Sequence, residues 1–149
     1  MPKYRRILVP VDGSPTSNKA LVAALDMARD VDARIRLVHL IDELAFITGF
    51  EASAEVLPMI RQGAERVLAE AAEIAKAAGV TAETQLLDRP GQRLGDCIAF
   101  EATDWDADLI VVGTHGRHGI QRALLGSGAE QIIRLAPVPV LVIRGDEES

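Results

Sequence analysis

The stretch ILVPVDGSPTSNKALVAALDMA, residues 7–28, decides how the chain begins to fold. Its first part, Ile7 to Val11, is a short and mostly β-branched apolar run, which is typical of a strand buried on both faces. Asp, Gly, Ser and Pro then supply the residues of a turn. From Ser17 onward, Leu21 and Ala28 belong to a series of apolar residues at helical spacing. The stretch therefore predicts a strand, a turn and a helix, and three hydroxyl residues could cap that helix: Ser14, Thr16 and Ser17.

The rest of the chain repeats this alternation of strand and helix. Apolar runs predict further strands over residues 35–41, 81–87, 109–112 and 138–143. Helical spacing predicts helices over 55–78 and 94–105 and another that opens at Ser127. Strands separated by helices indicate right-handed parallel crossovers. We therefore predict an α/β, doubly wound, Rossmann-like fold: a five-stranded parallel sheet of order 3-2-1-4-5, with helices on both faces. One domain is expected over 1–145, followed by a polar tail over 146–149.

Composition excludes several classes of protein. The chain has 149 residues, 3% aromatic side chains and a formal net charge of −6, which disfavour a nucleic-acid partner. The apolar run at 7–11 is too short for a signal peptide or a membrane span. The single cysteine, Cys97, lies in an apolar stretch, where a buried thiol is expected. These features predict a cytoplasmic protein without a membrane span.

The expected ligand site lies where the strand order reverses. In doubly wound sheets, ligands bind beyond the carboxyl ends of the strands at that point, which brings together Asp12, Leu40 and Gly113. Residues 113–127 read GTHGRHGIQRALLGS between a predicted strand and a predicted helix. Glycine allows close backbone approach, and amides at a helix start bind anions, so this loop can hold phosphate groups. Neither a P-loop nor the dinucleotide-binding glycine motif is present.

The glycine spacing resembles that of the universal stress protein family, in its ATP-binding branch. That signature is Gly, two residues, Gly, nine residues, Gly, then Ser or Thr, and it is met at Gly113, Gly116, Gly126 and Ser127. The likeness extends to residues 6–14 as an opening strand and 137–143 as a closing strand, whereas 44–100 match in pattern only. Gly128 departs from the family, because a larger residue is expected after the Gly-Ser pair.

The resemblance implies roles for individual residues. Pro10, Val11, Asp12 and Leu40 would face the adenine and ribose, and Val112 and Gly113 would line the nucleoside. The phosphates would be held by Gly116, Gly126, Ser127 and Gly128. Arg117 and Arg122 are candidates to meet the γ-phosphate, although exposed arginines are commonly only solvated. The expected cofactor is ATP, with Mg²⁺ carried on its phosphates.

Several of these residues have simpler explanations. Ser127 followed by Glu130 is also a capping box, which can coexist with phosphate binding. Asp12 could serve only to cap its turn. His39, His115 and His118 could approach one crevice, but without cysteine they are weak candidates for a metal site.

The function that we predict is that of an ATP-binding regulatory protein of the stress response. Nucleotide occupancy would order the 113–127 loop and modulate association with itself or with an unidentified protein partner. The alternatives are a dimeric interaction module that binds no nucleotide and a slow ATP hydrolase; autophosphorylation stays untested. Pro137 and Pro139 suit a sheet edge, because proline cannot donate to an interior ladder. In related proteins this strand pairs across a twofold axis, so a homodimer through Val140, Val142 and their neighbours is expected.

Overall fold

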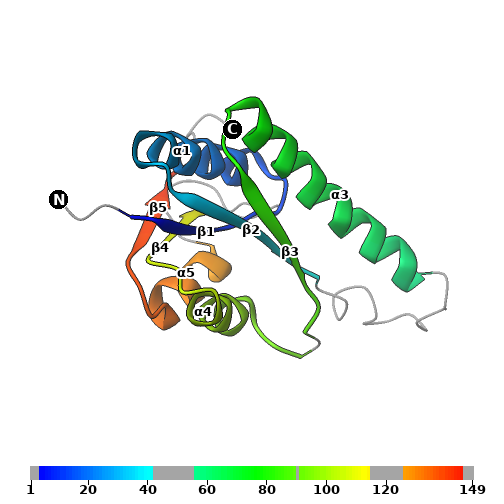
Figure 1. Ribbon diagram of the computed structural model, residues 1–149. Coiled ribbons are helices and arrows are strands. Elements are labelled where there is room, and N and C mark those ends of the chain that lie inside the picture. Colours follow the sequence, from blue (N-terminus) through cyan, green and yellow to red (C-terminus); the bar gives the residue numbers. More distant parts are fainter. Residues whose placement is uncertain (1–3, 42–55, 90, 115–125, 146–149) are drawn as a thin grey trace.

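The computed structural model describes residues 4–41, 56–89, 91–114 and 126–145, in which strands and helices alternate (Figure 1). The strands are β1 (Arg6–Pro10), β2 (Arg34–Leu40), β3 (Ala82–Leu87), β4 (Leu109–Gly113) and β5 (Val140–Ile143). The helices are α1 (Pro15–Val31), α3 (Val56–Ala77), α4 (Leu94–Asp104) and α5 (Ser127–Leu135).

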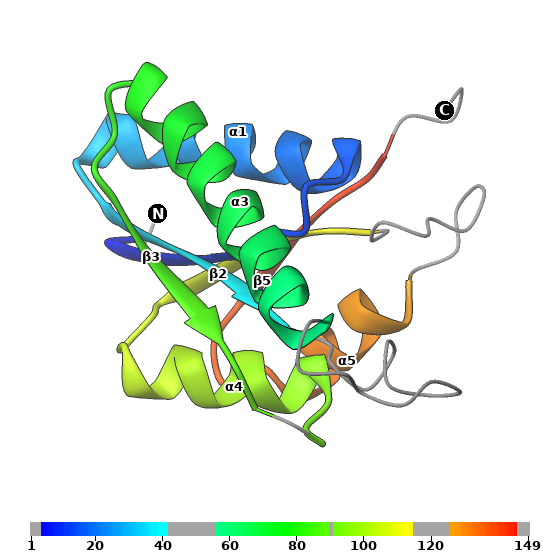
Figure 2. The ribbon, with the colours of Figure 1, turned by 90° about the vertical axis from the view of Figure 1, so that its right-hand side faces the viewer.

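The strands form one parallel sheet in the order β3-β2-β1-β4-β5. Helices α1 and α3 cover one face of this sheet, and α4 and α5 cover the other (Figure 2). The predicted doubly wound, Rossmann-like α/β fold with strand order 3-2-1-4-5 is therefore confirmed. Within the described part of the chain, none of the helices combines the length and apolarity needed to cross a lipid bilayer.

Alternation along each central strand divides the core into two layers. In β1, Ile7 and Val9 pack under α1 and α3, whereas Leu8 packs under α4 and α5. All three side chains are fully buried. A strand covered on both faces needs apolar residues at every position, which explains why its sequence is a continuous apolar run.

Two element boundaries differ from the sequence prediction because of proline. Helix α1 begins at Pro15, two residues before Ser17, since the fixed φ of proline and its missing N–H suit the first helical position. Ser14 is the N-cap, and its Oγ accepts a hydrogen bond from the Ser17 N–H at 3.1 Å. Strand β5 begins at Val140 instead of residue 138: the Pro139 carbonyl accepts from the Ile110 N–H at 3.0 Å, but proline has no N–H to return.

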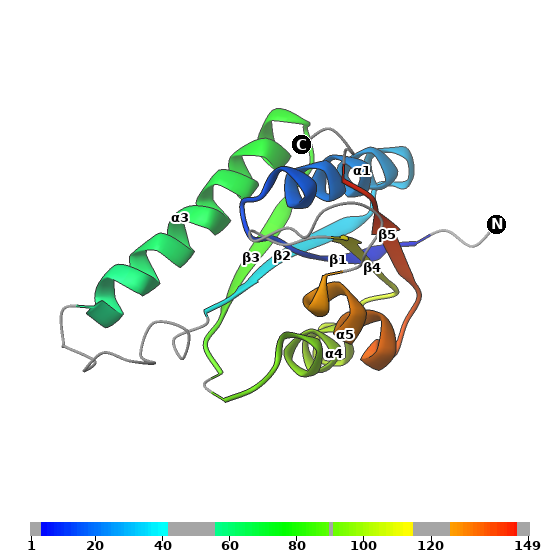
Figure 3. The same cartoon turned by 180° about the vertical axis from the view of Figure 1, so that it is seen from behind.

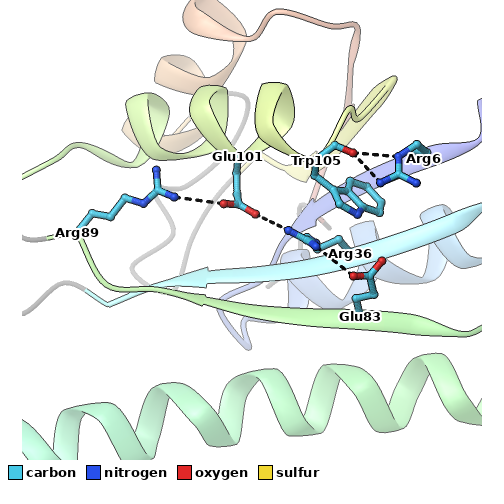
Figure 4. A network of polar contacts seen from close by, with 6 residues as sticks. All are labelled: Arg6, Arg36, Glu83, Arg89, Glu101 and Trp105. Atoms are coloured by element: carbon cyan, nitrogen blue, oxygen red, sulfur yellow. Dashed lines mark hydrogen bonds and ion pairs between the residues drawn. The ribbon is translucent and has the colours of Figure 1, made fainter.

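A network of ion pairs fastens α4 to the sheet (Figure 4). The Glu101 carboxylate of α4 is buried, and it accepts from Arg36 Nη1 at 2.9 Å and from Arg89 Nη2 at 3.3 Å. Arg36 lies on β2, and its Nη2 donates to Glu83 of β3 at 3.0 Å. The hydrogen bond from Arg36 is the largest cause of a lowered pKa for the Glu83 carboxyl. The network therefore joins β2, β3 and the α4 layer.

The end of α4 is tied to β1 in a similar way. The Trp105 carbonyl accepts from Arg6 Nε at 2.9 Å and from Nη2 at 2.7 Å, and the Arg6 guanidinium lies 4.4 Å from the centre of the Trp105 ring. The Asp108 carboxylate accepts from the backbone N–H groups of Arg5 at 2.8 Å and Arg6 at 3.0 Å. These contacts align β1 with the segment that enters β4.

Candidate functional site

The predicted site lies between β1 and β4, which are neighbours at the centre of the sheet (Figure 3). From this pair the chain continues in opposite directions, to β2 and β3 on one side and to β5 on the other. Ligand-binding crevices of doubly wound sheets lie beyond the carboxyl ends of strands at such a point. Asp12 follows β1 after one residue, and Gly113 ends β4. The strand order therefore brings these two predicted site residues to the same edge of the sheet.

The turn after β1 is held by its own side chains. The Asp12 N–H donates to Ser17 Oγ at 3.0 Å, and Asp12 Oδ1 accepts from the Ser14 N–H at 2.9 Å. Gly13 between them has a φ of 82°, a conformation that glycine adopts at no steric cost. Asp12 thus does cap its turn, as the simpler explanation proposed. Its role toward a nucleotide stays a prediction.

Strand β2 binds the end of β1 through backbone and side chain. The Val11 N–H donates to the Val38 carbonyl at 2.8 Å, and the Val11 carbonyl lies 2.7 Å from Nδ1 of His39. Leu40 is the last residue of β2, and it is half-buried. The Val11 side chain is buried in the core layer under α1. The end of β1 is therefore fixed against β2, and its N–H is already used by the sheet.

Gly113 is required by packing, and its role toward a nucleotide stays a prediction. A Cβ at this position would lie 2.7 Å from Cγ2 of Thr16 and 3.0 Å from the Thr16 carbonyl oxygen. Only glycine lets the end of β4 approach the first turn of α1 so closely. The preceding residue, Val112, has a buried side chain in the core layer under α4 and α5.

Thr114 is a junction that sequence reasoning missed. Its N–H donates to the Ile143 carbonyl at 2.9 Å, its carbonyl accepts from the Gly126 N–H at 2.6 Å, and its Oγ1 accepts from the Gly145 N–H at 3.3 Å. The residue is buried. It therefore connects the end of β4 to the start of α5 and to the end of β5. The feature of the sequence that could have indicated this role is a hydroxyl residue directly after Gly113, the first glycine of the signature.

The start of α5 carries no side-chain cap. The N-cap is Gly126, and Ser127 is the first helical residue, with an exposed side chain. The predicted capping box is therefore wrong: the chain enters the helix one residue earlier, and Glu130 Oε1 accepts from Arg134 Nη2 at 3.0 Å. An α-helix leaves its first amides without intrahelical acceptors, and its dipole favours anions there. This end of α5 is suited to a phosphate group.

Gly128 and Gly95 lie where α5 and α4 approach each other. A Cβ at Gly128 would lie 2.8 Å from Cδ2 of Leu94, and one at Gly95 would lie 2.6 Å from Cβ of Gln131. The Gly95 N–H also donates to Gln131 Oε1 at 3.0 Å. Small residues therefore allow α4 and α5 to pack closely. A Cβ at Gly128 would meet only the flexible end of the Leu94 side chain, whereas a Cβ at Gly95 would also meet the backbone of Gln131, so the close packing of the two helices depends chiefly on Gly95.

Some predicted residues lie outside the described residues. Gly116 and Arg117 are among them, with Arg122, His115 and His118. Within residues 4–41, 56–89, 91–114 and 126–145, no three His, Cys, Asp or Glu side chains are grouped as a metal site requires.

Cys97 and a nearby surface hollow lie away from the predicted site. The thiol is fully buried, its Sγ donates to Gln92 Oε1 at 3.3 Å, and burial raises the pKa of the thiol. The prediction of a buried cysteine is thus confirmed. The hollow is formed by residues after β3 and on α4, none of which was predicted to bind the nucleotide: Arg89, Gly91, Gln92, Arg93, Asp96 and Phe100.

The comparisons with known proteins agree with the fold. The model of the universal stress protein family matches residues 3–144. The chain is 34% identical over 143 residues to a universal stress protein of Methanocaldococcus jannaschii, covering 95% of this chain and 82% of that protein. The structure of the universal stress protein from Archaeoglobus fulgidus in complex with dAMP is 28% identical, with a TM-score of 0.72 over 95% of this chain and 99% of that chain. A universal stress protein in complex with cAMP is 26% identical, with a TM-score of 0.68 over 95% and 98% of the two chains.

These matches cover nearly the whole chain, and two of the similar structures hold an adenine nucleotide. The strand order and the glycine signature that begins at Gly113 point to the same group of proteins. The chain belongs to the universal stress protein family.

Proposed function

We propose that this protein binds an adenine nucleotide, ATP with Mg²⁺, at the carboxyl edge of β1 and β4. The observation that carries the proposal is the hydrogen bond of 2.6 Å between the Gly126 N–H and the Thr114 carbonyl. It holds the uncapped N-terminus of α5 beside the end of β4, where strand order already predicts a ligand. A strand end next to a helix N-terminus is a general means of holding phosphate.

Different residues contact different parts of the nucleotide. Pro10, Val11, Asp12 and Leu40 face the adenine and ribose, with Val112 and Gly113 beside the nucleoside. Val11 and Val112 have buried side chains, so they contribute backbone surface. The phosphates are held by Gly126, Ser127 and Gly128, with Gly116 and Arg117 from the segment between. The complexes of related proteins with dAMP and cAMP support the choice of adenine.

We further propose that nucleotide occupancy regulates association. Strand β5 is an edge of the sheet formed by the described residues, and Leu141 on it is an exposed apolar side chain. Such an edge can pair with a second copy of the chain, giving a homodimer around Val140 and Val142. Thr114 bonds both to the start of α5 and to the end of β5. Order imposed on the phosphate loop can therefore reach the dimer edge. A cytoplasmic regulatory role in the stress response, with a protein partner, fits this mechanism, and catalysis is not needed for it.

Calorimetric titration tests the binding half of the proposal. Nucleotide-free protein is titrated with ATP and Mg²⁺, with GTP and AMP as comparators. Ser127→Ala removes an exposed hydroxyl that caps nothing, so the fold should be unaffected while ATP binding weakens. Thr103→Ala, an exposed hydroxyl on α4, is the matched control and should bind ATP as the unaltered protein does. No heat and no thermal shift with any nucleotide would refute binding and leave a dimeric interaction module.

Sedimentation velocity tests the regulatory half. The dimer dissociation constant is measured with and without saturating ATP, and Leu141→Glu is expected to shift the protein to monomer. A dissociation constant that ATP leaves unchanged would contradict regulation of self-association.

A further inference from the structure

We propose that His39 is a positioning residue for the nucleotide: together with Ser17 it fixes the peptide between Val11 and Asp12. This inference rests on the proposed function, because it concerns the same site. His39 lies at the carboxyl end of β2, next to Leu40, and touches the end of β1 through its ring.

The contact defines the protonation of the ring. His39 Nδ1 lies 2.7 Å from the Val11 carbonyl oxygen. A carbonyl oxygen only accepts hydrogen bonds, so Nδ1 carries the hydrogen and donates it. In the neutral imidazole, Nε2 is then the nitrogen without a proton. The geometry thus specifies one tautomer of His39.

The same peptide unit is also held at its other end. Its N–H belongs to Asp12 and donates to Ser17 Oγ at 3.0 Å. Ser17 is buried in the first turn of α1, whereas His39 comes from β2. His39 of β2 therefore binds the carbonyl of this peptide and Ser17 of α1 binds its N–H. The peptide plane cannot rotate without breaking one of these hydrogen bonds.

The orientation of that plane sets where Asp12 points. Asp12 Oδ1 accepts from the Ser14 N–H at 2.9 Å, so the side chain is held as well as the backbone. A turn that is ordered before the ligand arrives loses less conformational freedom on binding. His39 therefore contributes to affinity by ordering Asp12 and its turn.

The test compares His39→Phe, which keeps the ring but has no donor, with His39→Asn. The Asn side-chain amide places an N–H as far along the side chain as Nδ1 of histidine. In calorimetric titration with ATP and Mg²⁺, His39→Phe is expected to bind about five- to tenfold more weakly, the effect of one hydrogen bond. His39→Asn should recover most of the affinity. A purely structural role would lower the melting temperature of both variants without this difference in affinity.

The outcomes separate this inference from the proposed function. If the unaltered protein binds ATP and His39→Phe binds it equally well, or His39→Asn binds as weakly as His39→Phe, the positioning role is wrong. If the unaltered protein binds no nucleotide, the proposed function fails and the inference falls with it. A measurement without variants guards against misfolding: ¹⁵N NMR of the imidazole should show a proton on Nδ1 in the neutral form. A proton on Nε2 instead would overturn the inference.

Discussion

The Glu101 network gives a prediction whose size can be worked out from the contacts. Glu101→Gln removes a charge but keeps the size of the side chain. The side chains of Glu101, Arg36 and Arg89 are 4%, 19% and 26% exposed, so the two arginines would lose a buried partner. Removing one member of a buried ion pair costs about 3–5 kcal/mol. Because Arg36 keeps Glu83 and both arginines reach some solvent, we expect the low end, about 3 kcal/mol.

Urea unfolding followed by circular dichroism measures this loss. For a chain of this size, the corresponding fall in melting temperature is about 6–12 °C. Glu130→Gln is the matched control, because its partner Arg134 lies on the same exposed helix face and such pairs contribute about 0.5 kcal/mol or less. A Glu101→Gln loss below about 1 kcal/mol, or equal losses in the two variants, would show that the ion pairs of Glu101 do not stabilise the fold.

Three further predictions concern a glycine, a carboxyl and the thiol. Gly113→Ala should lower the free energy of unfolding by about 1–3 kcal/mol, because the added methyl group overpacks the contact with Thr16. Gly63→Ala is the control: it lies in α3 with open space around it, and the free energy of unfolding should rise by up to about 1 kcal/mol. Equal effects of the two substitutions in denaturant titrations would contradict the close packing at Gly113. The pKa of Glu83 is lowered in the folded protein, chiefly by its hydrogen bond from Arg36. The ionised Glu83 therefore stabilises the fold above the ordinary carboxyl pKa, and this stabilisation is lost as the pH falls through the lowered pKa. Glu83→Gln should make the loss of stability at acid pH less steep. An acid limb of the stability-versus-pH curve that the substitution leaves unchanged would contradict this role of Glu83. The raised pKa and burial of Cys97 predict no reaction with a thiol reagent at neutral pH until denaturant is added, and rapid labelling of the native protein would show otherwise.

Sequence patterns predicted the fold well because β1 and β4, at the centre of the sheet, are buried on both faces. The runs at Ile7–Val11 and Leu109–Val112 are apolar throughout, and the helices between strands limit the connections to parallel crossovers. The two largest boundary errors, of two residues each, fall at proline. Helix α1 begins at Pro15, which the spacing of apolar residues does not indicate. The apolar run over 138–143 contains Pro139, so the run alone does not show that β5 begins at Val140.

The candidate site was less accessible from sequence, since its contacts join distant segments. Thr16 and Gly113 are 97 positions apart in the numbering, and their close approach is visible only in three dimensions. The capping box at Ser127 is a local pattern, but the chain enters α5 at Gly126, so the side chain that should cap lies inside the helix. His39 was considered only as a weak metal candidate, because nothing local links it to the carbonyl of Val11.

Nuclear magnetic resonance with ¹⁵N-labelled protein shows whether the nucleotide binds at the carboxyl edge of β1 and β4, because it locates the ligand as well as detecting it. ATP with Mg²⁺ is added, and the shifts of backbone amides are followed. The largest changes are expected at Asp12, Gly113 and the first turn of α5, from Ser127 onward, with little change at Gly91 and Arg93 in the hollow beside α4. Shifts concentrated at that hollow, or none at the start of α5, would contradict binding at this edge.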